Sequence, residues 1–374
     1  LNENQEIELL SVFPDDGLGL NPLFNYKIGL RIKNVALQIS PDINGEFFIQ
    51  RGLLKLAFEG NKFSVPMDLA GQKYQFQAVI PLAISYGRQV NIPFLNNFVQ
   101  RSYFGISTKF LAGIAFFESA FDTLTTITSN QNISIQTDII TKYSLGGAYI
   151  EADSILNSLF ISGDPIDYIL NYDNLLENPL EMVWNPSGLG YAFDLGLIMN
   201  INDNLSSSIA ITNLLGQIKW SGDSTIFEHR LKMNSQITMD ELQEAPDSAL
   251  SAGIEIDTNI AISSFQTNYP GALILGAEYS LDKIKLASNL KFGFSNELGA
   301  STTPRFSLGT EFRPVHWISL LGGISVGGYE GFQWGSGISM RLLFLQFSCA
   351  YSEYGGMLDS AKGFSLSLSN SIVF

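Results

Sequence analysis

The sequence is poor in charged residues. Only 15% of its 374 residues are Asp, Glu, Lys or Arg, whereas charged residues make up about 25% of an average soluble domain. Acidic residues outnumber basic ones by 36 to 21, which gives a formal net charge of −15. An acidic chain lacks the basic surface with which proteins bind nucleic acids, so we expect no nucleic-acid partner.

Cysteine and histidine are almost absent. Cys349 is the one cysteine, so no intramolecular disulfide can form, and two histidines, His229 and His316, are too few for a histidine-rich metal cage. Neither histidine lies in a motif with a nucleophilic serine, and no phosphate-binding loop occurs. We therefore expect no metal, no cofactor and no enzymatic activity.

A long apolar helix is also lacking. Residues 318–340 are the best candidate for a spanning helix, but they contain seven glycines, each of which costs about 0.8–1 kcal/mol in a helix. Hydrophobic residues are instead spread along the chain. That distribution is typical of a β-barrel, in which each strand carries only part of the apolar surface.

What the sequence does have is alternation with a period of two residues. In residues 363–374 large apolar side chains alternate with serines, and successive side chains of a strand point to opposite faces. The same pattern recurs in residues 75–86, 104–116, 191–200, 273–280, 285–294, 305–313 and 343–352. The polar positions include Gln, Lys, Arg, Glu and Asp, which suit a wet lumen. This repetition predicts a membrane barrel, apolar outside and polar inside.

We predict an all-β fold: a transmembrane, antiparallel, up-and-down β-barrel of about fourteen strands. The expected strands are 27–39, 74–88, 103–119, 131–150, 189–201, 204–219, 225–238, 270–281, 283–296, 303–314, 316–329, 331–343, 344–354 and 362–374. Tight turns are expected at 202–204, 281–283 and 314–316, and longer loops at 151–187, 239–269 and 295–302. An even strand number places both termini at the periplasmic side of the membrane.

Aromatic residues near the expected strand ends predict interfacial girdles. They are Tyr86, Tyr103, Trp220, Tyr279, Trp317, Trp334 and Tyr351.

The N-terminal part is organised differently, so we divide the chain into residues 1–72, which hold the first strand, and a barrel of residues 73–374. Residues 1–23 are acidic and irregular, and residues 47–58 can form a helix with one apolar side. This N-terminal segment either plugs the barrel lumen or forms a plain extension with a long loop. The sequence leaves both alternatives open.

Four segments carry a resemblance to a known group of outer-membrane barrels. They are NPSGLGYAFDLG at 185–196, ITNLLG at 211–216 with Lys219 and Trp220 after it, LGTEFRP at 308–314 and FSCAYSEYGG at 347–356. The chain resembles proteins similar to the long-chain fatty-acid transporter FadL and to PorV of the type IX secretion system. The resemblance covers roughly residues 100–374.

The resemblance implies a location in the bacterial outer membrane and two functions. A FadL-like protein holds or transports a hydrophobic small molecule or lipid. A PorV-like protein is instead an accessory subunit of a secretion or other surface complex. The expected partners are outer-membrane lipid, a hydrophobic ligand or a surface protein complex, and the barrel-assembly machinery during insertion.

Three groups of residues are the candidate sites. Apolar runs in the loop 151–187 suit a ligand funnel or a docking surface, with Leu156, Phe160, Ile166, Tyr168 and Ile169 as candidates. Asp194, Arg305, Glu311 and Arg313 share lumen-facing positions and could form a polar ladder. The terminal Phe374 resembles the C-terminal aromatic signal that the assembly machinery recognises on an unpaired strand; it could also simply end a strand at the interface.

Overall fold

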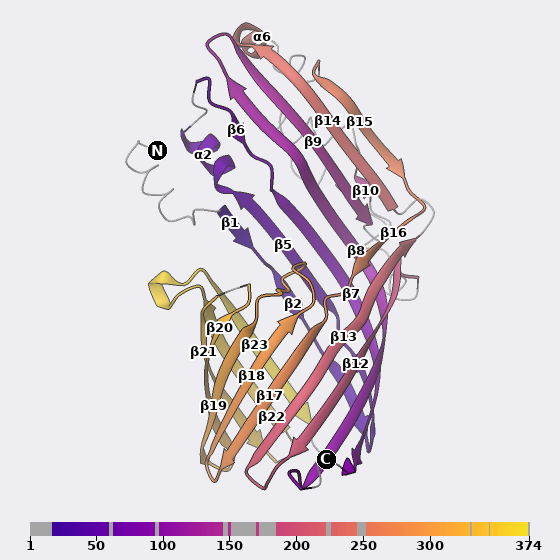
Figure 1. Cartoon of the computed structure of the whole chain (residues 1–374), viewed down its shortest axis with the longest axis vertical. Coiled ribbons are helices and arrows are strands. Elements are labelled where there is room, and N and C mark those ends of the chain that lie inside the picture. The colour runs from indigo at the N-terminus through magenta and orange to yellow at the C-terminus, as the bar shows by residue number, and fades with distance from the viewer. Residues whose placement is uncertain are drawn as a thin grey trace.

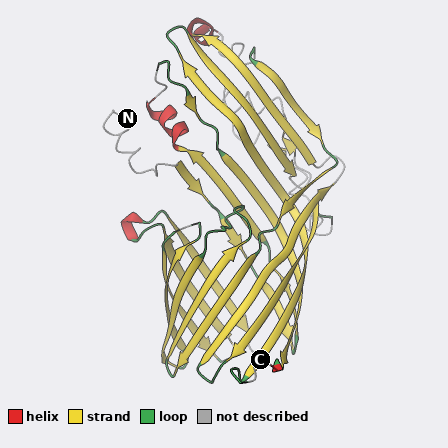
Figure 2. Ribbon diagram, in the orientation of Figure 1, coloured by secondary structure: helices red, strands yellow, loops and turns green. Residues whose placement is uncertain are grey.

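The computed structural model describes residues 17–59, 63–93, 97–144, 149–150, 170–171, 185–221, 226–244, 252–329, 331–343 and 345–372. These residues form an all-β structure in which one large antiparallel sheet curls into a barrel in the lower half of the molecule (Figures 1 and 2). No helix among them is long and apolar enough to cross a membrane.

The barrel wall consists of thirteen described strands, which follow one another around the barrel in chain order. They are β3 (Ile28–Ile32), β4 (Val35–Ile39), β7 (Lys73–Val90), β8 (Arg101–Thr128), β12 (Gly188–Asn200), β13 (Leu205–Ser221), β17 (Ala272–Leu281), β18 (Ile284–Gly293), β19 (Arg305–Val315), β20 (Ile318–Gly327), β21 (Gln333–Leu342), β22 (Leu345–Tyr354) and β23 (Gly363–Ile372). The predicted fold class is confirmed.

Two wall strands have a free edge. Every wall strand from β4 to β22 is paired on both sides, whereas the described residues of β3 pair only with β4 and those of β23 only with β22. Because each pair is antiparallel and the wall has thirteen strands, β3 and β23 run in the same direction. Large apolar side chains are strongly exposed on both edge strands, with Leu30 at 60% and Leu368 at 75%.

The strand count contradicts the expectation that both ends of the barrel wall lie on the same, periplasmic side. Residues 27–39, predicted as one strand, are the hairpin of β3 and β4, which turns at Lys33 and Asn34. An odd number of wall strands puts the two ends of the wall sequence at opposite ends of the barrel. β1 (Gly17–Leu20) accordingly lies in the upper half of the molecule, while β23 runs to the bottom (Figure 1).

An extension rises above the barrel. The lower half of β8 pairs with β12, but its upper half, from Phe116 to Thr128, pairs with β9 (Asn132–Ser144). β14 (Ile226–Thr238) and β15 (Ile254–Ala261) complete this upper sheet (Figure 1). The prediction that residues 131–150 and 225–238 belong to the barrel wall was therefore wrong. Alternation is equally regular in the wall and in the extension. It indicates only that a sheet has one apolar and one polar face, and not whether a face contacts lipid, water or protein.

The remaining elements are short. They are β2 (Leu23–Asn25), β5 (Asp42–Gln50), α2 (Arg51–Glu59), β6 (Met67–Asp68), β10 (Tyr149–Ile150), β11 (Leu170–Asn171), α6 (Met239–Glu244), β16 (Ser264–Asn268) and the 3-10 turn Leu358–Ser360. The expected helix over residues 47–58 begins only at Arg51, because residues 47–50 belong to β5, which pairs with β1 and β7. The described strands of the N-terminal segment are thus hydrogen-bonded into the sheet.

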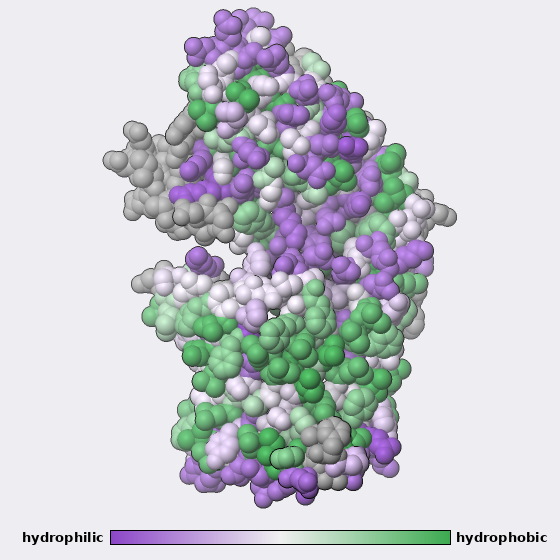
Figure 3. Space-filling model, in the orientation of Figure 1, coloured by the Kyte–Doolittle hydropathy of each residue, from purple (hydrophilic) through white to green (hydrophobic). Residues whose placement is uncertain are grey.

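The turns and the surface agree with the predicted orientation of the wall. The tight turns at 202–204 and 281–283 are confirmed, and the one predicted at 314–316 is formed by His316 and Trp317, because Pro314 and Val315 still belong to β19; all three lie at the lower end (Figure 2). A broad apolar band surrounds the visible face of the barrel, while the extension is mostly hydrophilic on that face (Figure 3). The outward positions of β19, β20 and β21 supply part of this band: Phe306, Leu308, Phe312, Leu320, Ile324, Val326, Ile338 and Met340 are 39–52% exposed.

Candidate ligand-binding lumen

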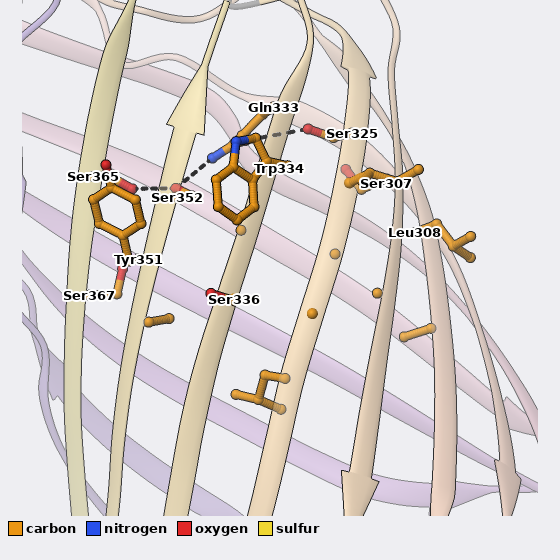
Figure 4. A pocket seen from close by; sticks show the side chains of 18 of the residues that line it. Ser307, Leu308, Ser325, Gln333, Trp334, Ser336, Tyr351, Ser352, Ser365 and Ser367 are labelled. Atoms are coloured by element: carbon orange, nitrogen blue, oxygen red, sulfur yellow. Dashed lines mark hydrogen bonds between the residues drawn. The ribbon is translucent and has the colours of Figure 1, made fainter. Parts of the chain in front are cut away.

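A groove of about 360 Å³ lies on the inner face of the wall, across β18 to β23 (Figure 4). Its inner-face side chains alternate with the exposed apolar ones, so they point into the lumen. The polar ones are Asn289, Arg305, Ser307, Ser325, Gln333, Ser352, Ser365 and Ser367. Apart from Leu321, the sequence places small or polar residues at every second position here, and the wall therefore presents a shallow surface with hydroxyl and amide groups to the lumen.

Hydrogen bonds join these side chains across the strands. Gln333 Nε2 donates to Ser352 Oγ at 2.9 Å, and the hydroxyls of Ser352 and Ser365 lie 2.7 Å apart (Figure 4). On the other side, Ser325 Oγ donates to Gln333 Oε1 at 3.3 Å, and Arg305 Nε donates to Ser325 Oγ at 3.2 Å. The chain of guanidinium, hydroxyl and amide groups thus crosses five strands, from β19 to β23.

Glycines form the floor of the groove. A Cβ atom at Gly335 would lie 2.9 Å from Ser352 Cβ and 3.0 Å from a backbone oxygen, so this position does not accept a side chain without a shift. At Gly309, by contrast, the nearest atoms to a Cβ would be 3.8 Å away. Gly309 therefore leaves real space in the lumen, and this space belongs to the groove.

The four residues of the predicted polar ladder all lie on the lumen side, but they divide into three separate contacts. Arg305 lies in the groove and donates to Ser325 and Gln333. Glu311 and Arg313, two residues apart on β19, form an ion pair of 2.8 Å, and Ser319 Oγ donates to Glu311 at 2.6 Å. Asp194 on β12 contacts none of these three and has its own cation.

That cation is Lys109 on β8, whose Nζ lies 2.8 Å from Asp194. Lys109 also donates to Asn213 Oδ1 at 2.6 Å, and the Asn213 backbone N–H donates to Asp194 at 2.8 Å. Asn213 has a φ of 52°, at a point where the pairing of β12 with β13 shifts register. The network therefore stabilises a bulge in the wall. There Asn213 adopts a left-handed backbone conformation, which is energetically unfavourable for a residue other than glycine.

A buried apolar cluster lies at the level where the extension begins. Trp220 is fully buried, lies over Gly113 and Gly188, and contacts the rings of Phe116 and Phe265. The prediction that Trp220 belongs to an interfacial girdle was wrong. Its position near a strand end fits a girdle, but its side chain faces inward. The register shifts between β12 and β13 change which alternate positions face inward, so the sequence alone does not reveal the orientation of Trp220.

Contacts across the mouth accompany this cluster. The hydroxyl of Tyr269, between β16 and β17, donates to Asp42 of β5 at 2.9 Å, and burial next to that carboxylate raises the pKa of Tyr269, which keeps the hydroxyl protonated. The Leu298 backbone N–H donates to Glu46 of β5 at 3.2 Å. The N-terminal strand β5 is thus tied to loops that are four or more wall strands away.

Two groups of predicted site residues lie outside the described residues. These are the loop candidates Leu156, Phe160, Ile166, Tyr168 and Ile169, and the terminal Phe374.

The sequence analysis did not identify Lys109 or the groove as sites. Lys109 is the only charged residue among the inward positions of 104–116, which is a usable signal for an ion-pair partner. The groove has no such signal, because it depends on the register that places Ser325, Gln333, Ser352 and Ser365 beside one another.

Comparisons with known proteins give one family and several similar structures. A model of DUF5723, described as a family of unknown function, matches residues 21–350. A FadL homologue from Pseudomonas aeruginosa is 11% identical, covers 93% of this chain and 74% of its own, and has a TM-score of 0.47. The monoaromatic hydrocarbon channel CymD is 11% identical over 99% and 91% of the two chains, with a TM-score of 0.40. The toluene transporter TodX of Pseudomonas putida is 11% identical over 96% and 88%, with a TM-score of 0.33. No curated protein matches the sequence.

Proposed function

The chain belongs to the DUF5723 family, whose function is unknown, and we propose that it is a bacterial outer-membrane β-barrel that holds or transports a hydrophobic small molecule or a lipid. The observation that carries this proposal is the combination of an exposed apolar belt outside with a polar, ligand-sized groove inside.

The belt supports membrane insertion. The strands β17 to β23 each have ten or eleven residues, and a transmembrane β-strand needs about 9–11. Their outward side chains are large, apolar and exposed. Soluble monomers rarely expose contiguous apolar patches larger than a few hundred Å², so a lipid environment explains this surface better than water.

The lumen supports a holding or transport role over free diffusion. The groove of about 360 Å³ is within the size range of small-molecule sites. Above it, the fully buried Leu111, Ile218 and Trp220 pack at the mouth. A wide aqueous pore would leave such positions lined by water, as in the large porin-type barrels.

Native mass spectrometry of the full chain, extracted from its own outer membranes in mild detergent, tests the proposal. We expect the protein in the outer-membrane fraction, with a discrete ligand mass bound at about one per chain. A protein that fractionates away from the outer membrane, or that carries only a broad distribution of bulk lipid, would contradict it.

The extension favours a second candidate, a PorV-like accessory subunit of a surface protein complex. β9, β14 and β15 rise beyond the apolar belt, and the described residues of β15 pair only with β14. A free edge strand is a common template for adding a partner strand. A stoichiometric protein partner in the same spectrum, with no discrete ligand, would favour this candidate.

A further inference from the structure

We propose that the lumen groove binds the hydroxyl-rich head of a single-chain amphiphile, such as a sugar head, and that its natural ligand is not a plain hydrocarbon. This inference rests on the proposed function and narrows the ligand class of the same site.

The lining chemistry points to such a head. On its inner face the groove presents the hydroxyls of Ser307, Ser325, Ser352, Ser365 and Ser367 and the amides of Asn289 and Gln333. Hydroxyls and amides both donate and accept hydrogen bonds, which matches a ligand that carries several hydroxyls. A hydrocarbon would remove these groups from water without replacing their hydrogen bonds, which is costly for each group covered.

The charge of the groove argues for a neutral head. Arg305 is the only charged residue among the described groove-lining residues, and its guanidinium donates to the neutral Ser325 and Gln333. One guanidinium can hold an anionic group bidentately, but the donors of Arg305 are already engaged by Ser325 and Gln333 of the wall. A sugar needs only neutral hydrogen-bonding groups, which this surface supplies beside its small and apolar residues.

The free edge of the wall provides a place for the acyl chain. β23 carries Ser365 and Ser367 on its groove side and Phe364, Leu366 and Leu368 on its outer side. The outer three are 62–75% exposed, more than the outward residues of the paired strands β19 and β20. A head in the groove is therefore one strand away from an accessible apolar edge, along which a chain can lie in the lipid.

Photoaffinity labelling of the full chain tests the inference. The protein is kept in lauryldimethylamine oxide, whose head carries no hydroxyl, and receives dodecyl maltoside with a diazirine on the sugar. We expect saturable labelling of the inner face of β21 to β23. Unlabelled dodecyl maltoside should compete, and a dodecyl chain on an ethylene glycol head should compete at least about tenfold less well.

A matched pair of double variants locates the site. Ser352→Val with Ser365→Val removes a hydroxyl pair inside the groove, 2.7 Å apart. Ser339→Val with Ser348→Val removes an equivalent lumen-face pair, 2.8 Å apart, that does not line the groove. Each variant removes both partners of one hydroxyl–hydroxyl hydrogen bond and takes the serine acceptor from one glutamine amide, Gln333 or Gln346, so the two variants are matched in their effect on folding. We expect labelling to fall about tenfold or more in the first variant and to stay unchanged in the second.

The outcomes separate this inference from the proposed function. Equal competition by both heads, labelling confined to the outer face, or equal loss in the two variants would overturn the sugar-head site. If a diazirine-labelled dodecane then labels the groove saturably, the hydrophobic-ligand proposal survives. If neither probe labels the lumen, both fail.

Discussion

A charge placed in the middle of the apolar belt should destabilise the protein far more than the same charge on the extension. Ile338 is the test position, because it faces outward, is 39% exposed and lies near the middle of β21. We consider Ile338→Arg in the full chain, folded into lipid vesicles.

The expected magnitude follows from the depth of the residue. Ten residues at about 3.4 Å each, tilted by about 40°, span roughly 26 Å, close to the height of the apolar band of a membrane barrel. Ile338 is then about 13 Å from the upper end of its strand. An arginine at the bilayer midplane costs about 2–4 kcal/mol, which is about 30-fold to several hundredfold in the folding equilibrium.

Two controls use the same substitution. Leu342→Arg lies at the end of β21, where the cost should fall to about 0–1 kcal/mol. Ile260→Arg lies on β15 of the extension, 54% exposed, and an exposed substitution in water changes stability by about 0.5 kcal/mol or less.

Urea unfolding from vesicles, followed by tryptophan fluorescence, measures the free energy of unfolding of each variant. The expected order of destabilisation is Ile338→Arg, then Leu342→Arg, then Ile260→Arg. If all three variants unfold within about 0.5 kcal/mol of each other, the belt does not face lipid and the reasoning is refuted.

Three further predictions concern the lumen, the mouth and the extension. Lys109→Met should cost about 2–3 kcal/mol in urea unfolding, because Asp194 loses its charged hydrogen-bond donor; a cost below about 0.5 kcal/mol would show that the pair is not stabilising. Trp220→Ala should cost about 3–5 kcal/mol as a buried truncation and should raise the entry of small sugars into swelling proteoliposomes; unchanged swelling would show that the cluster does not close the mouth. The hydrogen bond from Arg230 lowers the pKa of Asp138, so this pair stabilises the fold above the ordinary Asp pKa of about 3.9 and loses that effect as the pH falls through the lowered value. The stability difference between wild type and Asp138→Asn should therefore shrink between about pH 6 and pH 3, and a constant difference would contradict the assignment.

The wall could be predicted from the sequence because its physical cause is local. The serines of 363–371 and the apolar residues between them indicate a polar and an apolar face of one strand. Because lipid surrounds the whole barrel, the neighbouring strands repeat the same apolar outer face. The turns at 202–204 and 281–283 follow from the same segments, because short polar links between alternating runs leave room only for antiparallel neighbours.

The extension and the mouth could not be predicted, because they depend on where β8 changes partner. β8 is 28 residues long and pairs with β12 below and β9 above. Nothing local in residues 101–128 marks that change. The inward side of Trp220 is likewise set by bulges, such as the register shift between Tyr191 and Phe193, which invert the parity on which the reading of faces depends.

The groove shows the same limit. Ser352 and Ser365 are easily assigned to lumen faces, but their 2.7 Å contact needs the register of β22 with β23. The pairing of Lys109 with Asp194 joins residues 85 positions apart. The sequence could place each of these four residues on the lumen face, whereas their contacts with one another could be known only from the folded structure.

The most direct test of the account is ligand occupancy in the native mass spectrum of two glycine variants. Gly309→Leu fills the groove, and Gly196→Leu adds the same side chain to a lumen-facing position of β12 where no atom lies within 4 Å. We predict that the discrete ligand mass is lost from Gly309→Leu and kept by Gly196→Leu. Equal occupancy in both variants would contradict the claim that the lumen groove holds the ligand.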